Sequence, residues 1–421
     1  MTQLYAQPSC ADDYDPASLS VTEALQRIDQ VVAPITGFEK VALRSALSRV
    51  LAETIISPIN VPAYTNSAMD GYAVRAADLP GADGIAELTV IGTAWAGAPF
   101  DGTVEPGTAV RIMTGAVLPP GADCVVMQER AEREGDKVRI EPGNKAGQNI
   151  RQAGEDLATG APVLEAGRLL TPADLGVLAS LGIAEVRVWR RLQVAFFSTG
   201  DELRSIGERL AEGQIYDSNR YSLYGMLTRL GVDTIDMGVV RDRQEELRQA
   251  FRTAAANADA VITSGGVSVG EADFVKDILT SLGEVNFWKI AMKPGRPMAF
   301  GKIGNAVFFG LPGNPVSVMV TFYEFVQSAL KRMMGQKETA VVTVKVPCAT
   351  RLKKRPGRVE FQRGMLERLP DGGFVVHGVG DQGSGILSTM NRANCFIVLP
   401  EDCGNVEAGR LVDVQPFEGL I

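Results

Sequence analysis

A glycine-rich stretch at residues 259–273, DAVITSGGVSVGEAD, carries the clearest local pattern for binding an anion. A short apolar run ends at Ser264, Gly265 and Gly266 follow it, and Asp273 stands at the acidic start of a predicted helix. Glycines let backbone N–H groups approach a ligand, and a helix N-terminus adds partial positive charge. The stretch matches neither GxxxxGK[ST] nor GxGxxG, so a tight strand-to-helix connection explains it equally well on its own.

Polar and charged side chains follow the other predicted strands between residues 192 and 335 in the same way. Singly, each has a structural explanation: Asp242 suits a helix cap, and Pro315 suits the first turn of a helix. As a set, they supply the cations, glycine-rich turns and Mg²⁺-compatible carboxylates that a phosphate or oxyanion site requires. The set consists of Asp201 and Glu202 in STGDEL, Asp242 in VRD, Ser268 and Asp273 in the glycine-rich stretch, Lys289, Lys293 and Arg296 in WKIAMKPGRP, and Asn314 and Ser317 in GLPGNPVS.

The composition narrows the possible chemistry. His377 is the only histidine among 421 residues, so Ser-His-Asp, Cys-His and multi-histidine metal chemistry are nearly excluded. Any catalysis must rest on carboxylates, lysines, arginines and hydroxyl groups. The five cysteines are scattered without CxxC spacing, which favours free thiols in a reducing compartment over a zinc site.

Charge and hydropathy exclude two further classes. The 42 basic and 50 acidic residues give a net charge of −8, which argues against a general nucleic-acid binder. No apolar run approaches the roughly 18 residues that a membrane span needs, and the N-terminus lacks a basic region followed by an apolar segment. We therefore expect a cytoplasmic protein that binds neither nucleic acid nor membranes.

Periodicity along the chain predicts a multidomain α/β plus β protein. Helical patterns cover 21–32, 43–55 and 171–181, the first of them preceded by Ser20 and Glu23 at capping-box spacing. Short β-type runs fill the region between the second and third helices and return after about residue 340, whereas strands and helices alternate from 192 to 335. The predicted domains are a segmented helical or linker domain at 1–57 and 156–189, an inserted small β domain at 58–155, a central doubly wound, mostly parallel α/β domain at 190–336, and a C-terminal β-barrel domain at 337–421.

The outer regions hold further motifs with open interpretations. Asp70 in NSAMDGYAV and Thr114 in RIMTGAVLP each precede a glycine, and a simple turn would account for both. RQAGED ends at Asp156, where the chain leaves the inserted β region. The stretch KKRPGRVEFQRG at 353–364 is expected to be a solvated basic edge strand, and DQGSG at 381–385 is a glycine-rich loop.

Taken in order, these motifs resemble one family. SAMDGYAV, RIMTGA, GED, FSTGDEL, GQIYDSN, TSGGVSVGEAD, KPGRP and GLPGNPVS are similar to the motifs of the MoeA and gephyrin E-domain family of molybdopterin molybdenumtransferases. The similarity runs from about residue 20 to the C-terminus, and several of the motifs are long and unusual.

The resemblance implies both a fold and an activity. Family members are elongated homodimers of four domains, and their central domain is like that of the molybdopterin adenylyltransferases. They take molybdate and adenylylated molybdopterin as substrates, use Mg²⁺ or another divalent ion, and release molybdenum cofactor and AMP. The cleft lies between the central domain of one subunit and the inserted β domain of the other. An adenylyltransferase that delivers substrate and proteins that accept the cofactor are the implied protein partners.

The resemblance also assigns roles to individual residues. Catalytic roles fall to Asp70, Thr114, Glu202, Asp242, Asp273, Lys289 and Lys293, and metal binding falls to Asp242, Asp273 and Glu202. Substrate binding falls to Asp156, Ser264, Gly265, Gly266, Ser268, Arg296, Pro312, Pro315, Ser317, Arg358 and Ser384. One departure is visible, because the family's KPGKP is KPGRP here, and Arg296 presents a planar fork in place of a point charge.

Two other functions are weighed against this one. A molybdopterin adenylyltransferase would share the central domain, but the inserted and C-terminal domains belong to the later step. A gephyrin-like scaffold would bind partner proteins, but no fused adenylyltransferase domain or long linker is present in these 421 residues. The sequence leaves open which divalent ion is used, whether molybdate is preferred to tungstate, which proteins deliver substrate or accept cofactor, how far the domains hinge, and whether Arg296 alters substrate handling.

Overall fold

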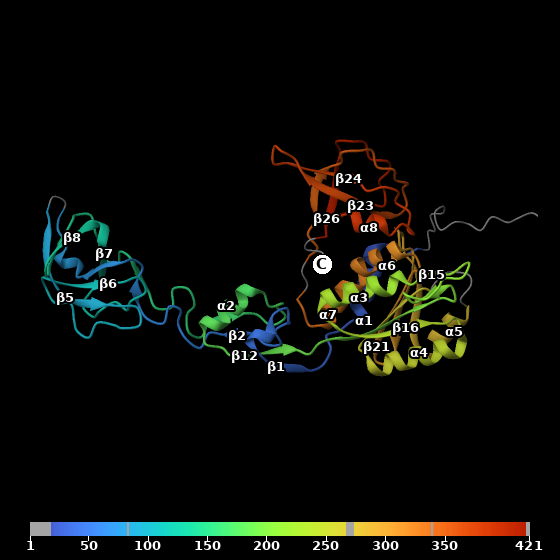
Figure 1. Cartoon of the computed structure of the whole chain (residues 1–421), viewed down its shortest axis with the longest axis horizontal. Coiled ribbons are helices and arrows are strands. Elements are labelled where there is room, and N and C mark those ends of the chain that lie inside the picture. The colour runs from blue at the N-terminus through green and yellow to red at the C-terminus, as the bar shows by residue number, and fades with distance from the viewer. Residues whose placement is uncertain (1–17, 82–83, 267–272, 338–339, 418–421) are drawn as a thin grey trace, which may run out of the picture. The chain divides into compact units, whose positions relative to one another are not determined.

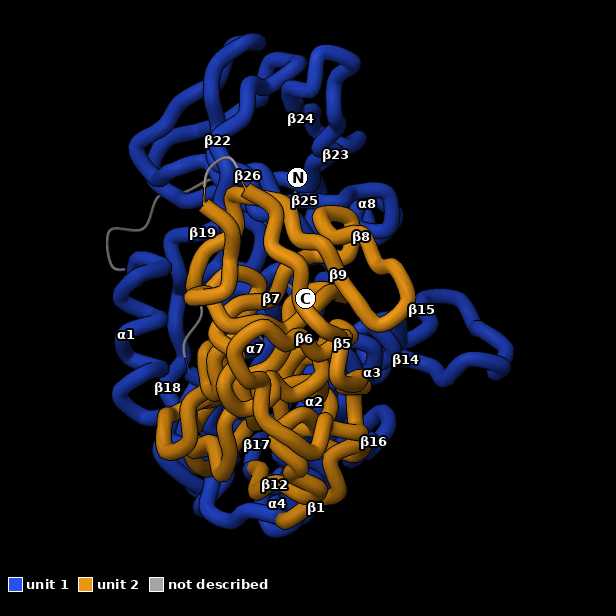
Figure 2. The backbone as a smooth tube through the Cα atoms, turned by 90° about the vertical axis from the view of Figure 1, so that its left-hand side faces the viewer, with its two compact units in different colours: residues 1–39, 48–50, 189–421 blue, residues 40–47, 51–188 orange. Residues whose placement is uncertain are grey.

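The computed structural model describes residues 18–81, 84–266, 273–337 and 340–417 (Figure 1). The chain divides into two compact units, which Figure 2 shows in different colours. Unit 1 comprises residues 1–39, 48–50 and 189–421, and unit 2 comprises residues 40–47 and 51–188. No helix in the described ranges is long and apolar enough to cross a membrane.

Unit 2 contains a six-stranded sheet that accounts for the β-type runs in this part of the sequence. Its strand order is β7-β4-β6-β5-β9-β8; only the β5–β6 pair is parallel. Alternate residues of β4 enter two apolar clusters, Tyr72 in one and Ala73 in the other, so both faces of the sheet are buried. The strands are β4 (Gly71–Val74), β5 (Ala86–Ala94), β6 (Thr108–Ile112), β7 (Cys124–Met127), β8 (Ala131–Glu134) and β9 (Lys137–Ile140).

The remainder of unit 2 is built from short elements. Helix α2 (Pro172–Ser180) confirms the helix expected at 171–181, and Thr171 and Asp174 form a capping box at its start. The small paired strands are β2 (Ile55–Ile56) with β11 (Pro162–Leu164), and β3 (Asn66–Ser67) with β10 (Ile150–Arg151). Strands β1 (Phe38–Ala42) and β12 (Glu185–Trp189) also pair, and short 3₁₀ turns occur at η2 (Ala76–Asp78) and η3 (Gln128–Arg130).

The helix expected at residues 43–55 is wrong. The structure has only a 3₁₀ turn, η1 (Leu43–Ala46), after which Ser48 takes a positive φ of 60°. Leu51 then forms an antiparallel bridge with Val188 and is fully buried. The apolar residues of this segment satisfy their backbone groups by pairing with a distant strand, which a local periodicity cannot reveal.

Unit 1 is centred on a six-stranded sheet of order β16-β13-β17-β21-β20-β18. The first four strands are mutually parallel, whereas β20 is antiparallel to both of its neighbours. The largely parallel sheet expected from the alternating pattern is therefore present, with an antiparallel hairpin at one side. The strands are β13 (Gln193–Thr199), β16 (Asp233–Val240), β17 (Ala260–Ser264), β18 (Gly283–Lys289), β20 (Pro297–Ile303) and β21 (Ala306–Leu311).

Helices cover both faces of this sheet (Figure 1). One apolar cluster contains Phe196 with Leu223 and Leu227, and the other contains Phe197 with Phe251 and Ile278. The first face carries α1 (Val21–Val31), α3 (Ser218–Leu230), α6 (Pro315–Thr321), the π-helical turn η4 (Phe322–Val326) and α7 (Gln327–Met333); the second carries α4 (Gln244–Asn257) and α5 (Asp273–Leu282). The helix expected at 21–32 is confirmed, including the capping box of Ser20 and Glu23.

The C-terminal part of unit 1 is a second β-sheet, of order β19-β23-β25-β26-β22 with β24 paired to β23. A bridge between Cys348, just after β22, and Val376 connects the β22 end of this order to β24. The elements are β19 (Met292–Lys293), β22 (Val344–Pro347), β23 (Val359–Arg368), β24 (Phe374–Gly378), β25 (Cys395–Leu399), β26 (Leu411–Pro416) and α8 (Ser388–Arg392). Strand β19 directly follows β18 of the central sheet in the chain, but it pairs with β23 of the C-terminal sheet. The two sheets are therefore linked within one unit.

Candidate active site

The loops that follow the parallel strands meet at one edge of the central sheet. In the strand register Thr199 is opposite Val240, Ser198 is opposite Ser264, and Ser264 is opposite Leu311. Strand β18 runs in the same direction as β21, because both are antiparallel to β20. The acidic loops, the glycine-rich turn, the PGNP loop and the lysine loop therefore emerge at the same edge, as the sequence predicts.

The glycine-rich turn packs tightly against the end of β13. Gly265 and Gly266 have φ angles of +89° and +70°, which side-chain-bearing residues rarely adopt. A Cβ atom on Gly265 would lie 2.6 Å from the backbone oxygen of Thr199, and one on Gly266 would lie 2.9 Å from Thr199 Oγ1. The turn thus has no room for a side chain next to Thr199, so its close packing against β13 requires glycine at both positions.

Two predicted residues of this stretch fall outside what can be described. Ser268 lies outside the described residues. Asp273 begins α5, which places its backbone at a helix start, but its side chain is also outside the described set. Their expected roles stay predictions.

Three carboxylates lie near one another at the ends of β13 and β16. Partial burial raises the pKa of Asp242, and the negative charges of Asp201 and Glu202 raise it further. The expected helix cap is wrong, because the N-cap of α4 is Arg243 and no side chain caps this helix. Asp242 is thus left facing like charges, a situation that a bound cation would relieve.

The lysine loop packs against the helix that follows PGNP. A Cβ atom on Gly295 would lie 2.5 Å from Thr321 Oγ1 of α6, which shows how closely the loop approaches this helix. Lys293, half-buried in β19, is opposite Glu360 of β23, and Lys289 is exposed at the end of β18. The backbone oxygen of Arg296 accepts the N–H of Ile290 at 2.8 Å, closing the loop at its base.

The PGNP loop follows the central sheet and contacts the C-terminal part of unit 1. Pro312 follows β21 and Pro315 is the first residue of α6, as expected for a helix entry. Ser317 is 3% exposed within this helix. The N–H of Val316 donates to the backbone oxygen of Ser384 at 3.1 Å, so the structure brings the DQGSG loop to the PGNP loop.

The basic stretch 353–364 is not the solvated edge strand that its composition suggests. Arg363 is 1% exposed and donates from Nη2 to the backbone oxygen of Gly383 at 3.0 Å. Burial lowers its pKa to about 10. Arg363 therefore holds the loop that carries Ser384, a role hidden by the exposed-looking charge pattern around it. Arg358 precedes β23, whose first residue, Val359, donates its N–H to the backbone oxygen of Ala291.

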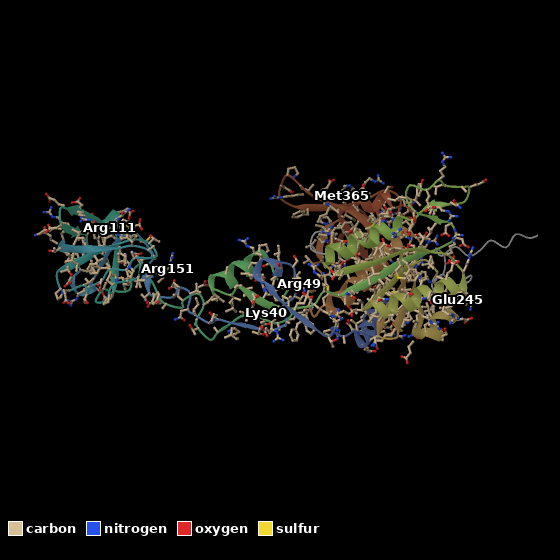
Figure 3. All side chains as sticks on the ribbon, turned by 60° about the horizontal axis from the view of Figure 1, so that its bottom comes forward. Lys40, Arg49, Arg111, Arg151, Glu245 and Met365 are labelled. Carbon is tan, nitrogen blue, oxygen red and sulfur yellow. The ribbon has the colours of Figure 1, made fainter. Side chains whose placement is uncertain are left out.

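In unit 2 the structure brings together Asp70 and Thr114, which are 44 positions apart in the sequence. They meet because the start of β4 pairs with the end of β6. Asp70 Oδ1 accepts hydrogen bonds from the N–H and the hydroxyl of Thr114, both at 2.7 Å. These two bonds, with the charge of Arg111, lower the pKa of Asp70. Arg111 is labelled in Figure 3 and lies over the ring of Tyr72 at 5.1 Å.

Asp156 occupies an exposed turn of unit 2, and its N–H donates to the backbone oxygen of Val61. The described structure records no hydrogen bond between Asp156 and either Asp70 or Thr114. The sequence-derived site residues therefore fall into two sets by unit: one at the edge of the central sheet, and a second in unit 2, where Asp70 pairs with Thr114 and Asp156 lies in a different turn.

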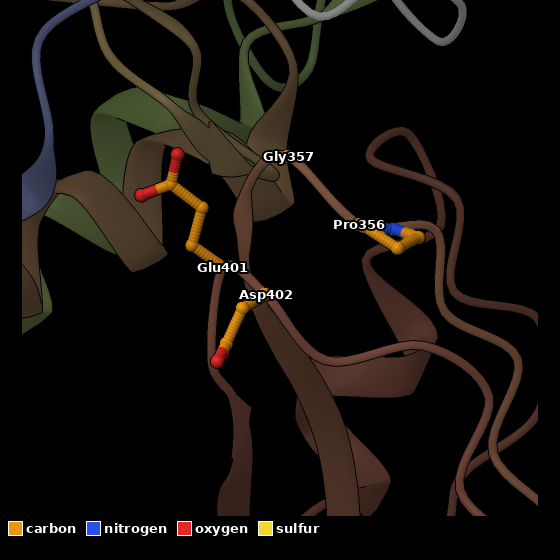
Figure 4. Close-up of a pocket in the computed structure, with 4 residues that line it drawn as sticks. All are labelled: Pro356, Gly357, Glu401 and Asp402. Carbon is orange, nitrogen blue, oxygen red and sulfur yellow. The ribbon is translucent and has the colours of Figure 1, made fainter.

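An open cavity of about 520 Å³ lies in the C-terminal part of unit 1, lined by Pro356, Gly357, Glu401 and Asp402 (Figure 4). None of these four residues belongs to the sequence-derived site. Asn219 of α3 was also missed, although it lies in the GQIYDSN motif. Its amide nitrogen donates to Ser264 Oγ at 2.8 Å and to the backbone oxygen of Gly313 at 2.7 Å.

The fold is that of a multidomain protein of mixed α/β and β structure, whose candidate site lies at the carboxyl ends of its parallel strands. Family models match most of the chain: the MoeA N-terminal region (domain I and II) at residues 19–182, the probable molybdopterin binding domain at 195–332, and the MoeA C-terminal region (domain IV) at 345–417. The chain belongs to the MoeA family, which confirms the resemblance seen in its motifs.

Curated relatives match over most of their length. The molybdopterin molybdenumtransferase of Haemophilus influenzae is 48% identical over 402 residues, covering 94% of this chain and 97% of the relative. That of a Nostoc species is 39% identical over 370 residues, covering 86% of this chain and 85% of the relative. The crystal structure of the molybdopterin biosynthesis moeA protein from Pyrococcus horikoshii superposes with a TM-score of 0.84 at 32% identity, covering 95% of this chain and 100% of that one.

Proposed function

We propose that this chain is a molybdopterin molybdenumtransferase that inserts molybdate into adenylylated molybdopterin and releases AMP, the last step of molybdenum cofactor biosynthesis. Family membership and the names of the relatives support the transferase step. The structural observation that carries the proposal is the gathering of the glycine-rich turn, the acidic loops, the lysine loop and the PGNP loop at one edge of the central sheet.

In this proposal the chain acts mainly by positioning and by charge stabilisation. The N–H of Gly266, with Lys289 and Lys293, holds the anionic groups of the substrates, while Gly265, whose N–H donates to the backbone oxygen of Leu311, shapes the turn. Arg296 and Ser317 lie on the loop and helix that pack together beside them, and Ser384 is held there through Val316. The remaining predicted binding residues, Ser264, Ser268, Pro312, Pro315 and Arg358, contribute to the walls of the same site.

A divalent cation fits this edge if the protein supplies few of its ligands. The described residues contain no group of three or more His, Cys, Asp or Glu side chains placed to hold a metal ion. The charge of Glu202 is nevertheless close enough to Asp242 to raise the pKa of Asp242, in addition to the larger effects of burial and Asp201. Mg²⁺ usually takes only one or two carboxylates and completes its shell with water and substrate phosphates. Asp242 and Glu202, with Asp273, would therefore hold such an ion, which would supply positive charge against the pyrophosphate.

The second group of residues points to a homodimer. Asp70 and Thr114 form an ordered, exposed, negatively charged pair in unit 2, and Asp156 is exposed in the same unit. We propose that they complete the cleft of a second copy, as the family resemblance implies. The four-domain division belongs to the same proposal, as do action in the cytoplasm and an adenylyltransferase and cofactor-accepting proteins as partners.

Two incubations of purified protein test the proposed function. With adenylylated molybdopterin, molybdate and Mg²⁺, we expect release of AMP that stops when molybdate is left out. With molybdopterin and ATP but no molybdate, we expect no adenylylated product. Formation of that product would favour an adenylyltransferase, and tight binding of a peptide partner without either reaction would favour a scaffold.

A further inference from the structure

We propose that Asn219 is a positioning residue that holds the glycine-rich turn and the PGNP loop together as one rigid anion-binding surface. Its Nδ2 atom donates to Ser264 Oγ at 2.8 Å and to the backbone oxygen of Gly313 at 2.7 Å. Ser264 is the last residue of β17, directly before the glycine-rich turn, and Gly313 lies in the PGNP loop after β21. A single amide group on α3 therefore joins two loops that belong to different strands.

The two loops are in direct contact where Asn219 joins them. The N–H of Gly265 donates to the backbone oxygen of Leu311 at 3.1 Å, and a Cβ atom on Gly313 would lie 3.9 Å from the Cα of Gly265. On its other side the turn abuts Thr199. The turn is thus held between the end of β13, the PGNP loop and the side chain of Asn219.

The chemistry of the amide supports a positioning role. Asn219 is 8% exposed, and its Oδ1 atom is buried without a hydrogen-bond partner in the described structure. Burying an unpaired amide oxygen is unfavourable, so this asparagine carries a cost that a purely structural residue would avoid. Capping of α3 does not explain it, because Asp217 is the N-cap and accepts the N–H of Arg220.

The inference deepens the proposed function and rests on it. If the turn and the PGNP loop hold the anionic substrate, loosening their connection should weaken substrate binding more than the chemical step. A variant that merely unfolds more easily has fewer active molecules, so its apparent kcat falls while KM stays unchanged. The split between KM and kcat therefore separates positioning from general stability.

Asn219→Ala and Asn219→Asp test the inference, with Asn257→Ala as the control. Asn257 is exposed at the end of α4, where its amide nitrogen donates only to the backbone oxygen of Thr253. In Asn219→Asp the hydroxyl of Ser264 can still donate, but the oxygen of Gly313 loses its donor. We expect KM for adenylylated molybdopterin to rise about tenfold in both Asn219 variants, with kcat within about twofold of the wild type. Asn257→Ala should match the wild type in both.

Hydrogen–deuterium exchange gives a readout that does not need activity. Peptides covering residues 260–266 should exchange faster in the Asn219 variants than in Asn257→Ala, because the turn has lost its tether. Unchanged exchange in the folded Asn219→Asp protein, or an unchanged KM in both Asn219 variants of an active enzyme, would overturn the inference. A wild type that releases no AMP with molybdate would instead count against the proposed function, while the exchange result would still decide the role of Asn219.

Discussion

Asp70 shows how two hydrogen bonds can fix the chemical state of an exposed carboxylate. Both come from Thr114, one from its N–H and one from its hydroxyl, and both end on Oδ1. They lower the pKa of Asp70, and the charge of Arg111 acts in the same direction. Because a lowered pKa keeps the carboxyl group ionised to lower pH than an ordinary aspartate, Asp70 can act as a fixed negative charge or a hydrogen-bond acceptor and not as a proton donor near neutral pH.

Thr114→Val tests whether the orientation of this carboxylate matters for the reaction. The variant keeps the backbone bond and removes only the hydroxyl bond, so the pKa of Asp70 should rise part of the way toward its ordinary value. We expect kcat/KM to fall by about tenfold because Asp70 is then held by one bond in place of two. Steady-state assay of AMP release is the measurement.

Thr171→Val is the matched control for that experiment. Asp174 Oδ2 accepts the N–H and the hydroxyl of Thr171 at 2.8 Å each, in the same unit but at the start of α2. Loss of the Thr171 hydroxyl should lower the free energy of unfolding by about 1 kcal/mol and leave kcat/KM unchanged. Equal activity of the two variants would show that the Asp70–Thr114 pair is only a turn.

At the scale of elements, the helical segment formed by α6, η4 and α7 contains a half-buried acid with one fully shielded oxygen atom. Glu324 lies in the π-helical turn η4, and its Oε1 atom is shielded from solvent without a hydrogen-bond partner in the described structure. Burial raises the pKa of Glu324 to about 8. Turns of this type are often found where a protein accepts local strain for function.

This acid should make stability depend on pH, with a definite sign. The folded protein retains the proton up to about pH 8, whereas the unfolded chain releases it near 4.5. The contribution of Glu324 to stability is therefore fully present below pH 4.5 and is lost as the pH rises to about 8, by up to about 1.4 kcal/mol per pH unit. Glu324→Gln should unfold at a higher temperature than the wild type at pH 8.5 and at a similar one at pH 4.5.

Thermal unfolding across this pH range is the measurement, with Glu245→Gln as the control. Glu245 is exposed in the first turn of α4 and is labelled in Figure 3. The control should shift the unfolding temperature little and equally at each pH above 5. A Glu324→Gln protein that follows the wild type at every pH would show that the carboxyl is not held neutral in the fold.

The elements also show which features a sequence can predict. Helices α1 and α2 follow from local caps and period, and the shared strand-end edge follows from polar residues placed after successive apolar runs. The sequence could not exclude a helix at 43–55, because what prevents it is pairing of Leu51 with the distant Val188. The buried position of Arg363 was equally hidden, since its partners lie about 20 residues further along the chain.

At the scale of the whole molecule, the predicted site residues are divided between the two units. Unit 1 holds the strand-end loops together with Lys293 and Ser384, and unit 2 holds Asp70, Thr114 and Asp156. The sequence predicts which residues belong to each set, because each of them lies within a recognisable motif. It cannot predict contacts such as that between Val316 and Ser384, which depend on how two sheets share one core.

The most direct test of the central claim is molybdate-dependent AMP release by Asp242→Asn and Lys293→Ala. Each has a control with the same change in charge at the other end of the sheet: Asp233→Asn at the start of β16 and Lys302→Ala in β20, both exposed. We predict that kcat/KM falls about a hundredfold or more in the two site variants, because each removes charge that stabilises the reaction, and stays near the wild-type value in the two controls. Near-normal turnover in both site variants would contradict the placement of the active site at this edge.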